Sequence, residues 1–249
     1  MIIIKSAGQI ERMRKAGAIV RDVLNLVGDH IKEGVSTKQL DKLAYEYITK
    51  QGAKPSFLGY NGFPGSLCTS VDDEVVHGIP SDKVILTEGM LVKIDAGAFI
   101  GGFHGDAART FPVGKVSAEK RKLMNICIES FFRGINILKE GVRLGDLGHE
   151  IQSYVEAAGF SVVREMVGHG IGQNMHEDPN VPNYGTAGRG IRLAKNMTLA
   201  VEPMINAGGK EIYLDASDGW TIRTADGSCS AHYENTIVIL EDGVEILTL

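Results

Sequence analysis

The chain of 249 residues has few of the features that mark several large protein classes. Its only three cysteines, Cys68, Cys127 and Cys229, form no CxxC pair, which argues against a disulfide framework or a thiolate zinc site and favours a reducing cytoplasm. No apolar run approaches the ~20 residues that a membrane-spanning helix needs. The net charge of −5 argues against a dedicated nucleic-acid-binding protein. We therefore expect no direct binding to nucleic acid or membrane.

Glycine, by contrast, is frequent, at 31 of 249 residues, and it separates segments whose patterns alternate between helix and strand. Ser6–Gln9 and Ser36–Gln39 both have the S-x-x-Q form of a capping box, and apolar residues follow each one at helical spacing. Residues 55–115 then contain short β-favouring runs broken by Gly and Pro. The same order returns with helices predicted over about 117–139 and 144–158, followed by strands. The β-favouring runs of the first half are Val84–Leu86, Met90–Asp95 and Arg109–Phe111.

Two pairs of short segments indicate that the second half of the chain repeats the first. Val76–Ile79 resembles Gly168–Ile171, and Glu88–Asp95 resembles Lys195–Glu202. In the second pair, each segment is a strand pattern that ends in an acid. Halves of this kind would pack their sheets together and bring both acidic strand ends to one centre.

The division of the chain follows from this repeat. No Pro/Ser-rich linker separates the halves, so we predict one catalytic domain, residues 1–249, with halves at about 1–115 and 116–249. The order helix-helix-strands, found twice, predicts an α/β (α+β) protein.

Acidic residues adjoin apolar strand patterns at four places, although an unpaired buried carboxylate is costly. Asp95 ends one pattern and Asp106 opens the next, so strand, turn and strand would set the two side by side. Close carboxylates repel unless they share a proton or a cation. Glu202 follows Leu199–Val201, and Glu234 adjoins a β-branched segment. Taken singly, each acid also has an ordinary interpretation as a turn, salt-bridged or solvent-facing residue.

His169 lies between two glycines that leave its side chain unshielded and let other backbone approach it; alone, it could equally be a core or surface histidine. With the four acids it completes an oxygen-rich donor set with one nitrogen, which suits divalent Mn, Fe, Co or Zn. Four negative charges balance two divalent ions. A two-metal site with a shared water that becomes a nucleophile near neutral pH is the simplest electrostatic solution.

The segments that carry these residues resemble the type I methionine aminopeptidases. The matching pieces run through almost the whole chain in family order and are specific as a set. They are Ala7–Gly17, Val76–Pro80, Ile94–Asp95, Phe103–Asp106, Gly168–Gly172, Met175–Glu177, Val201–Pro203 and Tyr233–Glu234. The resemblance implies the pita-bread fold, whose two pseudo-twofold-related halves each have two helices and an antiparallel sheet. It also implies removal of the initiator methionine from nascent proteins whose second residue is small.

The resemblance further implies a metal ligand set of Asp95, Asp106, His169, Glu202 and Glu234 around two divalent ions and a bridging hydroxide. Asp95 would chelate one ion, and Asp106 and Glu234 would bridge both. His169 and Glu202 would complete the other site. Glu202 would also take the proton from the bridging water.

By the same resemblance, His77 and His176 are catalytic histidines that position the peptide and stabilise the tetrahedral intermediate. The residues expected to bind substrate are Tyr60, Phe63, Cys68, His77, His176 and Trp220. Aromatic and sulfur groups suit the thioether of methionine. From sequence alone, Tyr60 and Phe63 could equally belong to an ordinary core.

Five positions depart from the common bacterial pattern: Asn61, Lys93, Met175, His232 and Asn235. None is expected to be a metal ligand, so hydrolysis is not in doubt, but the substrate range or the pH optimum could differ. His232 would share a strand face with Glu234, since alternate residues of a strand point the same way. We expect it either to contact a ligand from outside the metal sphere or to lie at the surface.

Two other functions remain open at this stage. An aminopeptidase or dipeptidase acting at Xaa-Pro bonds shares the fold but usually carries a further N-terminal domain, for which the helical start at Ser6 leaves no room. A non-catalytic binding module would have lost ligands, whereas this chain retains them. We expect a cytoplasmic monomer that acts on N-terminal Met peptides or nascent chains and, by family analogy, docks on the ribosome.

Overall fold

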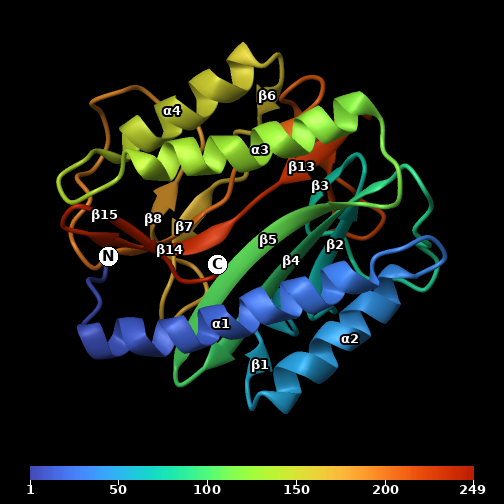
Figure 1. Ribbon diagram of the computed structural model, residues 1–249, viewed down its shortest axis with the longest axis horizontal. Coiled ribbons are helices and arrows are strands. Elements are labelled where there is room, and N and C mark those ends of the chain that lie inside the picture. Colours follow the sequence, from blue (N-terminus) through green and yellow to red (C-terminus); the bar gives the residue numbers. More distant parts are fainter.

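Helices and strands alternate in two blocks, as the sequence predicted (Figure 1). The computed structural model describes residues 1–249, and no helix in it is long and apolar enough to cross a membrane. The four α-helices are α1 (Ala7–His30), α2 (Thr37–Lys50), α3 (Ala118–Asn136) and α4 (Leu144–Ala157). The strands are β1 (Lys54–Pro55), β2 (Leu67–Val71), β3 (Glu74–Val76), β4 (Leu91–Ile100), β5 (Phe103–Pro112), β6 (Ser161–Val162), β7 (Gly168–Gly170), β8 (Glu177–Val181), β9 (Thr198–Val201), β10 (Met204–Asn206), β11 (Ile212–Leu214), β12 (Ile222–Thr224), β13 (Ser230–His232), β14 (Asn235–Leu240) and β15 (Gly243–Ile246).

Both predicted capping boxes are present at the starts of α1 and α2. The Ser6 hydroxyl accepts from the Gln9 backbone N–H at 3.3 Å, and the Ser6 N–H donates to the Gln9 side-chain oxygen at 2.8 Å. Ser36 and Gln39 repeat the same exchange at 3.2 and 2.8 Å. Each box satisfies backbone N–H groups that a helix start otherwise leaves unpaired. The helix starts are therefore fixed by local sequence.

The long hairpin of β4 and β5 is the centre of the first half. Strands β1 and β2 pair with β4, while the second half holds a five-stranded sheet in the order β15-β14-β9-β7-β8. Two three-stranded sheets, β13-β10-β6 and β11-β12-β3, complete the fold. All the pairings are antiparallel, which confirms an α/β protein with antiparallel sheets.

The two halves share a local turn that supports their structural repetition. Before β4, the Thr87 N–H lies 3.3 Å from the Met90 sulfur, and the Met90 N–H donates to the Thr87 carbonyl at 3.2 Å. Before β9, the Ala194 N–H lies 3.4 Å from the Met197 sulfur, and the Met197 N–H donates to the Ala194 carbonyl at 3.1 Å. In the first half this turn leads into β4, which contains Asp95. In the second half the same turn leads into β9, which Glu202 follows.

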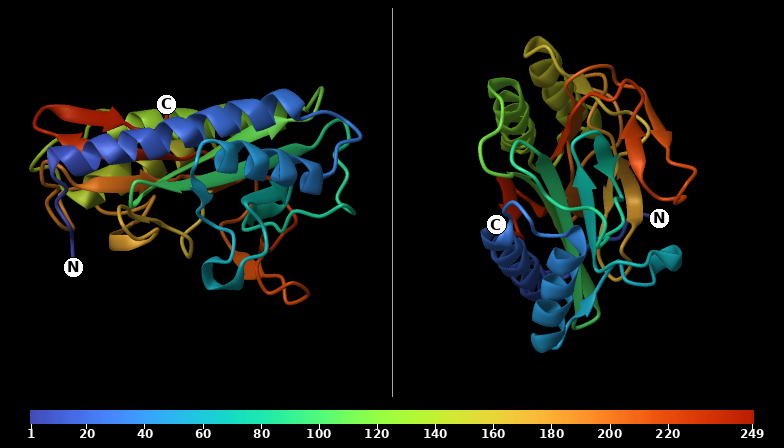
Figure 2. Two further views of the ribbon diagram at one scale, coloured as in Figure 1. Left: turned by 90° about the horizontal axis from the view of Figure 1, so that it is seen from below. Right: turned by 90° about the vertical axis from the view of Figure 1, so that its right-hand side faces the viewer.

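The helices gather on one side of the sheets, and the loops and short strands gather on the other (Figure 2). A cluster of 18 buried apolar residues lies between the first two helices and the β4–β5 hairpin. A second cluster, of 23 residues, lies beneath α3 and α4. Each half thus has its own apolar core, and the side of the sheets away from the helices is free to hold polar groups.

The halves meet where β5 passes the residue before β14. The Glu234 N–H donates to the Ala108 carbonyl at 3.0 Å, and the Thr236 hydroxyl donates to the Asp106 carbonyl at 2.9 Å. The Asp106 N–H donates back to the Thr236 hydroxyl oxygen at 3.0 Å. One backbone hydrogen bond and two bonds of the Thr236 hydroxyl therefore fix the relative position of two acids that come from different halves.

Helix α1 approaches the hairpin and the C-terminal segment at backbone distance. A Cβ atom built at Gly17 would overlap the carbonyl oxygen of Leu247, and one built at Gly105 would lie 2.8 Å from the Gly17 nitrogen. Only glycine allows this approach, since a methyl group at either position would displace a backbone segment.

Three strand predictions need correction. Asp106 does not open its strand, because β5 begins three residues earlier, at Phe103. Val84–Leu86 forms no strand; only Ile85 makes a single bridge, to Ser36. Its neighbour there is the start of α2, which offers too few extended residues for a ladder. Asp95 does not end its strand, because β4 continues to Ile100. The residues after Asp95 are small, and a Cβ at Gly97 would lie 2.7 Å from the Cβ of Ser56, so the strand passes closely beneath the chain that precedes it.

Candidate metal centre and adjoining pocket

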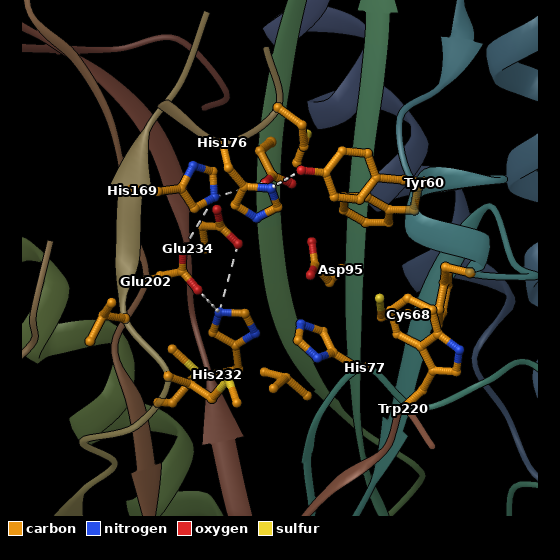
Figure 3. Close-up of a pocket in the computed structure, with 18 of the residues that line it drawn as sticks. Tyr60, Cys68, His77, Asp95, His169, His176, Glu202, Trp220, His232 and Glu234 are labelled. Carbon is orange, nitrogen blue, oxygen red and sulfur yellow. Dashed lines mark hydrogen bonds and ion pairs between the residues drawn. The ribbon is translucent and has the colours of Figure 1, made fainter. Parts of the chain in front are cut away.

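A cavity of about 250 Å³ is lined by residues of both halves. Figure 3 shows acids and histidines at one end of it and aromatic and sulfur-bearing side chains at the other. All of the site residues expected from the sequence line this cavity: Tyr60, Phe63, Cys68, His77, Asp95, Asp106, His169, His176, Glu202, Trp220 and Glu234. The fold thus brings together residues that are far apart along the chain.

The four acids come from two pairs of strands. In the β4–β5 register, Asp95 stands opposite Ala108 and Asp106 stands opposite Gly97, so the two acids are diagonal neighbours on one face. Glu202 directly follows β9 and Glu234 directly precedes β14, which pair with each other. Asp106 and Glu234 are 3% and 1% exposed, so these carboxyl groups have almost no contact with solvent.

His169 points its Nε2 atom at the acids. This atom lies 3.7 Å from Asp106 Oδ2 and 3.6 Å from Glu202 Oε1. Its Nδ1 atom lies 2.9 Å from the Gly170 carbonyl oxygen, which can only accept, so Nδ1 carries the proton and Nε2 keeps a free lone pair. A neutral imidazole with this orientation is ready to bind a cation.

The glycines that flank His169 are required by the sheet. A Cβ at Gly168 would overlap the Ala200 carbonyl oxygen, and a Cβ at Gly170 would overlap the Asp178 carbonyl oxygen. The sequence indicated that backbone approaches closely here, and the strands on both sides of β7 do so. This close packing fixes the position of His169 relative to the acids.

Burial dominates the proton equilibria of the site. It raises the pKa of Asp95 to about 7, and it raises the pKa of Asp106, Glu202 and Glu234 well above the usual range, with repulsion between the acids adding to the effect. Burial lowers the pKa of His169 to about 3. Ionised acids at this density need positive charge close by.

The donor set fits divalent cations. Asp95 Oδ1, Asp106 Oδ1 and Glu234 Oε1 are buried and have no hydrogen-bond partner. Two groups of donors each lie within 4.8 Å of one another: Asp95, His232 and Glu234 form one, and Asp106, His169 and Glu234 form the other. Glu234 belongs to both groups. Buried carboxylate oxygens without partners, together with neutral imidazoles, are the ligands that first-row divalent ions take.

The other end of the cavity is apolar. Phe63, Cys68 and Met175 are nearly inaccessible and pack in one cluster with Phe57, and Trp220 meets Phe63 edge to face at 5.2 Å. A thioether-bearing side chain would find ring edges and sulfur around it here. Tyr60 and Phe63 are thus part of the cavity wall.

Two histidines, His77 and His176, and Tyr60 lie between the apolar end and the acids. The Tyr60 hydroxyl is hydrogen-bonded to His176 Nδ1 at 2.8 Å, and the His176 ring lies 4.2 Å from the His169 ring, centre to centre. His77 follows β3 with φ at +61°, a left-handed conformation that is uncommon for histidine and that turns its ring into the cavity (Figure 3). Burial lowers the pKa of His77 to about 4, so the ring is neutral.

Of the five departures from the family pattern, Asn61, Met175 and His232 line the cavity. Lys93 donates to the Asp72 carbonyl at 2.8 Å and Asn235 accepts from Arg109 at 2.7 Å, both outside the cavity wall. His232 is only 1% exposed, so the surface alternative for this residue is wrong. Three of the five departures, at positions 61, 175 and 232, therefore lie in the cavity wall itself.

The sequence did not identify Met166, Val167 and Met204 as parts of the wall. Met204 stands two residues after Glu202, and alternate residues of an extended chain share a face, so this signal was available. Met166 and Val167 lie in a loop whose course no local pattern fixes.

Comparisons with known proteins show which family this chain resembles. A model of metallopeptidase family M24 matches residues 11–241. The methionine aminopeptidase of Clostridium acetobutylicum is 53% identical over 249 residues, covering 100% of this chain and 99% of that protein. Methionine aminopeptidase 1 of Bacillus subtilis is 50% identical over 248 residues, with 100% and 99% covered. The crystal structure of methionine aminopeptidase from Rickettsia prowazekii matches with a TM-score of 0.98 at 42% identity and 100% coverage of both chains. These matches confirm the fold and the family that the sequence motifs predicted.

Proposed function

This chain belongs to metallopeptidase family M24, and from that membership we propose that its cavity hydrolyses the first peptide bond of chains that begin with methionine. The observation that carries the proposal is a buried set of acids and imidazoles that opens directly onto an apolar pocket lined by rings and sulfur. The acids would hold the ions that hydrolysis requires, and the pocket would bind the methionine side chain of the substrate.

We assign the cations to Asp95, Asp106, His169, Glu202 and Glu234, with two ions of Mn, Fe, Co or Zn. Glu234 is shared by both donor groups, which supports a pair of neighbouring ions. When bound, such ions polarise the scissile carbonyl and make a water nucleophilic near neutral pH. This donor set accepts several of these metals, so cellular supply contributes to the choice among them.

Glu202 is the proton acceptor in this proposal. Its carboxylate lies 3.6 Å from His169 and 3.9 Å from His232, and its side chain is 13% exposed, more than those of Asp106 and Glu234. It can therefore meet a water that enters from the cavity. Burial raises its pKa well above the usual range, so it holds a proton more readily than an ordinary carboxylate.

His77 and His176 position the substrate. The Tyr60 hydroxyl orients the His176 ring, whose other nitrogen is free to meet the peptide. His77 is neutral and half-buried at the boundary between the acids and the apolar pocket, where the scissile carbonyl would lie. Either imidazole can donate to the oxygen that becomes negative during hydrolysis.

The substrate side chain is assigned to Tyr60, Phe63, Cys68 and Trp220, together with the two histidines. The Tyr60–His176 pair stands beside His169, so it narrows the space beyond the scissile bond. A small second residue would fit past this pair, whereas a large one would collide with it.

Nascent chains that begin with methionine are the substrates that this specificity implies, and the cytoplasm is where they emerge. Three free cysteines accord with a reducing compartment. Docking on the ribosome and a monomeric state rest on the family resemblance.

The test is a peptide panel with purified protein that has been stripped by a chelator and then supplied separately with Mn²⁺, Fe²⁺, Co²⁺ or Zn²⁺. We expect release of methionine from Met-Ala-Ser, little release from Met-Leu-Ser, and no reaction before metal is added. Preference for a Xaa-Pro peptide would favour the alternative peptidase, and failure to retain any divalent ion would favour a binding module.

A further inference from the structure

His232 is a buried imidazole with no hydrogen-bond partner on either nitrogen. The residue is 1% exposed, and both Nδ1 and Nε2 are inaccessible to solvent. Burying a polar group without a partner is costly, so such a group in a native protein needs a reason. No protein atom supplies one here.

The backbone holds His232 in place without help from its ring. The His232 N–H donates to the Thr110 hydroxyl oxygen at 2.9 Å, and the Thr110 hydroxyl donates to the His232 carbonyl at 2.8 Å. These bonds tie β13 to β5, which also carries Asp106. The hydrogen bonds between β13 and β5, which belong to different halves, therefore set the position of the ring.

The ring faces the acids as His169 does, from the opposite side (Figure 3). His232 Nε2 lies 3.7 Å from Glu234 Oε2 and 3.9 Å from Glu202 Oε2. For His169 Nε2 the corresponding distances are 3.7 Å to Asp106 and 3.6 Å to Glu202. All four are too long for hydrogen bonds.

Distances of this size suit ligands that share an ion. With metal–ligand bonds of about 2.0–2.2 Å, two atoms on one ion stand roughly 3–4 Å apart. The donor atoms of Asp95, His232 and Glu234 all lie within 4.8 Å of one another, as do those of Asp106, His169 and Glu234. The two groups are alike: each has one aspartate, one imidazole and the shared glutamate.

We propose that His232 is a direct nitrogen ligand of the ion assigned to Asp95 and Glu234, so that each ion of the pair has one imidazole. The inference rests on the proposed function, which supplies the ions, and it revises the expectation that none of the five departures is a ligand. A nitrogen ligand at this site would favour ions that accept imidazole, such as Zn²⁺, over Mg²⁺ and Mn²⁺, which suit oxygen ligands.

A protonated His232 paired with the acids is the competing structural explanation. The distances argue against it. His232 Nε2 stands 3.9 Å from Glu202 Oε2 and 3.7 Å from Glu234 Oε2, whereas a protonated ring in an ion pair would donate a hydrogen bond of about 2.7–2.9 Å. Neither ring nitrogen has a hydrogen-bond partner, so the geometry is that of a ligand and not of an ion-pair partner.

The experiment compares metal binding by the full chain in four forms: wild type, His232→Gln, His169→Gln and His149→Gln. His149 is exposed on α4 and serves as the matched control. Calorimetric titration of the stripped protein with Zn²⁺ should show two binding events in wild type and His149→Gln. In His232→Gln we expect one event to weaken at least tenfold and the visible absorption of the Co²⁺-loaded protein to change. Circular dichroism establishes that each variant is folded.

Loss of affinity alone does not separate a ligand from a neighbour of a ligand, so wild-type protein labelled with ¹⁵N-histidine gives the decisive measurement. Addition of Zn²⁺ should shift one ring nitrogen of His232 as strongly as Nε2 of His169. A His232 signal that stays at its metal-free position overturns the inference, even if the variant is inactive. If wild type binds two ions and releases methionine while His232→Gln binds Zn²⁺ equally well, only this inference fails. If wild type binds no ion, the proposed function fails with it.

Discussion

Lys5 Nζ lies 2.6 Å from Glu177 Oε2, and the two side chains are only 2% and 3% exposed. Glu177 opens β8 directly after His176, and its second oxygen accepts from the Asn174 N–H at 3.2 Å. The Lys5 N–H also donates to the Asn196 carbonyl at 3.0 Å. This buried ion pair therefore fastens the segment before α1 to the loop that carries His176.

Lys5→Met should destabilise the protein strongly. The variant leaves Glu177 buried without its partner, which typically costs about 3–5 kcal/mol. The double variant Lys5→Met/Glu177→Leu removes both charges and should regain most of the loss. Denaturant unfolding of the three proteins measures this. A double variant as unstable as the single one would show that the effect comes from packing and not from the unpaired carboxylate.

Glu202→Gln should lower kcat by about 10²–10⁴-fold while the fold persists, because the amide keeps the volume of the side chain and cannot accept the proton. Steady-state release of methionine from Met-Ala-Ser, with circular dichroism as the check on folding, measures this. Glu241→Gln is the control, since Glu241 is 73% exposed and pairs with Lys195 at the surface. Full turnover in Glu202→Gln would contradict its assigned role.

Asp106→Asn should lose metal and activity together. Asp106 is 3% exposed and belongs to one of the two donor groups, so an amide there removes charge from the centre of the site. Metal content after dialysis, and the rise in Tm on adding Mn²⁺, should both fall toward zero. Asp82→Asn, at an exposed turn position, should leave both unchanged. Wild-type metal content in Asp106→Asn would refute its assignment as a ligand.

The metal-free protein should lose stability as the pH rises from about 7 to 8. Burial raises the pKa of Asp95 to about 7 and that of Asp106, Glu202 and Glu234 further still. In the unfolded chain the corresponding pKa is about 4, so the folded state binds more protons and the free energy of unfolding falls as the pH rises. The site histidines are largely neutral in both states across this window, because their pKa is lowered on folding.

Urea unfolding of chelated protein at several pH values measures this slope. Saturating Mn²⁺ should flatten it, since bound cations displace the protons from the folded site. Stability that increases with pH in the chelated protein would contradict the raised pKa of these acids.

Gly17→Ala should destabilise the protein by roughly 1–3 kcal/mol, the usual range for overpacking, because its methyl group would overlap the Leu247 carbonyl oxygen. Gly8→Ala is the matched control on the same helix, since its methyl group would meet nothing within 4 Å. The control should be neutral or gain up to about 1 kcal/mol from better helix propensity. Equal stability of the two variants in thermal unfolding would show that α1 can shift away from residue 247.

Local signals made part of this architecture predictable from sequence. The capping boxes at Ser6 and Ser36 act within four residues, so their outcome does not depend on the rest of the fold. The acids adjoining apolar strands indicated a charged centre, because few other arrangements tolerate them. Asp95 and Asp106 also lie close along the chain, which made their pairing on a hairpin foreseeable.

Long-range relationships were not predictable in this way. Alternation along an extended chain predicts that His232 and Glu234 share a face, whereas in the structure β13 ends at His232 and β14 begins after Glu234. Whether His232 is buried depends on its contacts with β5 of the other half, which no local pattern predicts. The Lys5–Glu177 pair joins residues from opposite ends of the chain, and no local pattern marks it. The extension of β4 past Asp95 depends on small residues passing beneath Ser56, a contact made only in the folded protein.

The donors of the candidate metal centre are contributed by both halves, from Asp95 in β4 to Glu234 just before β14. A growing polypeptide cannot assemble the whole set until its synthesis has passed residue 234. Until then Asp95 and Asp106 lack the other residues with which they would bind a cation. The chain would consequently become able to hydrolyse peptides only late in its synthesis, when the two halves come together around the metal centre.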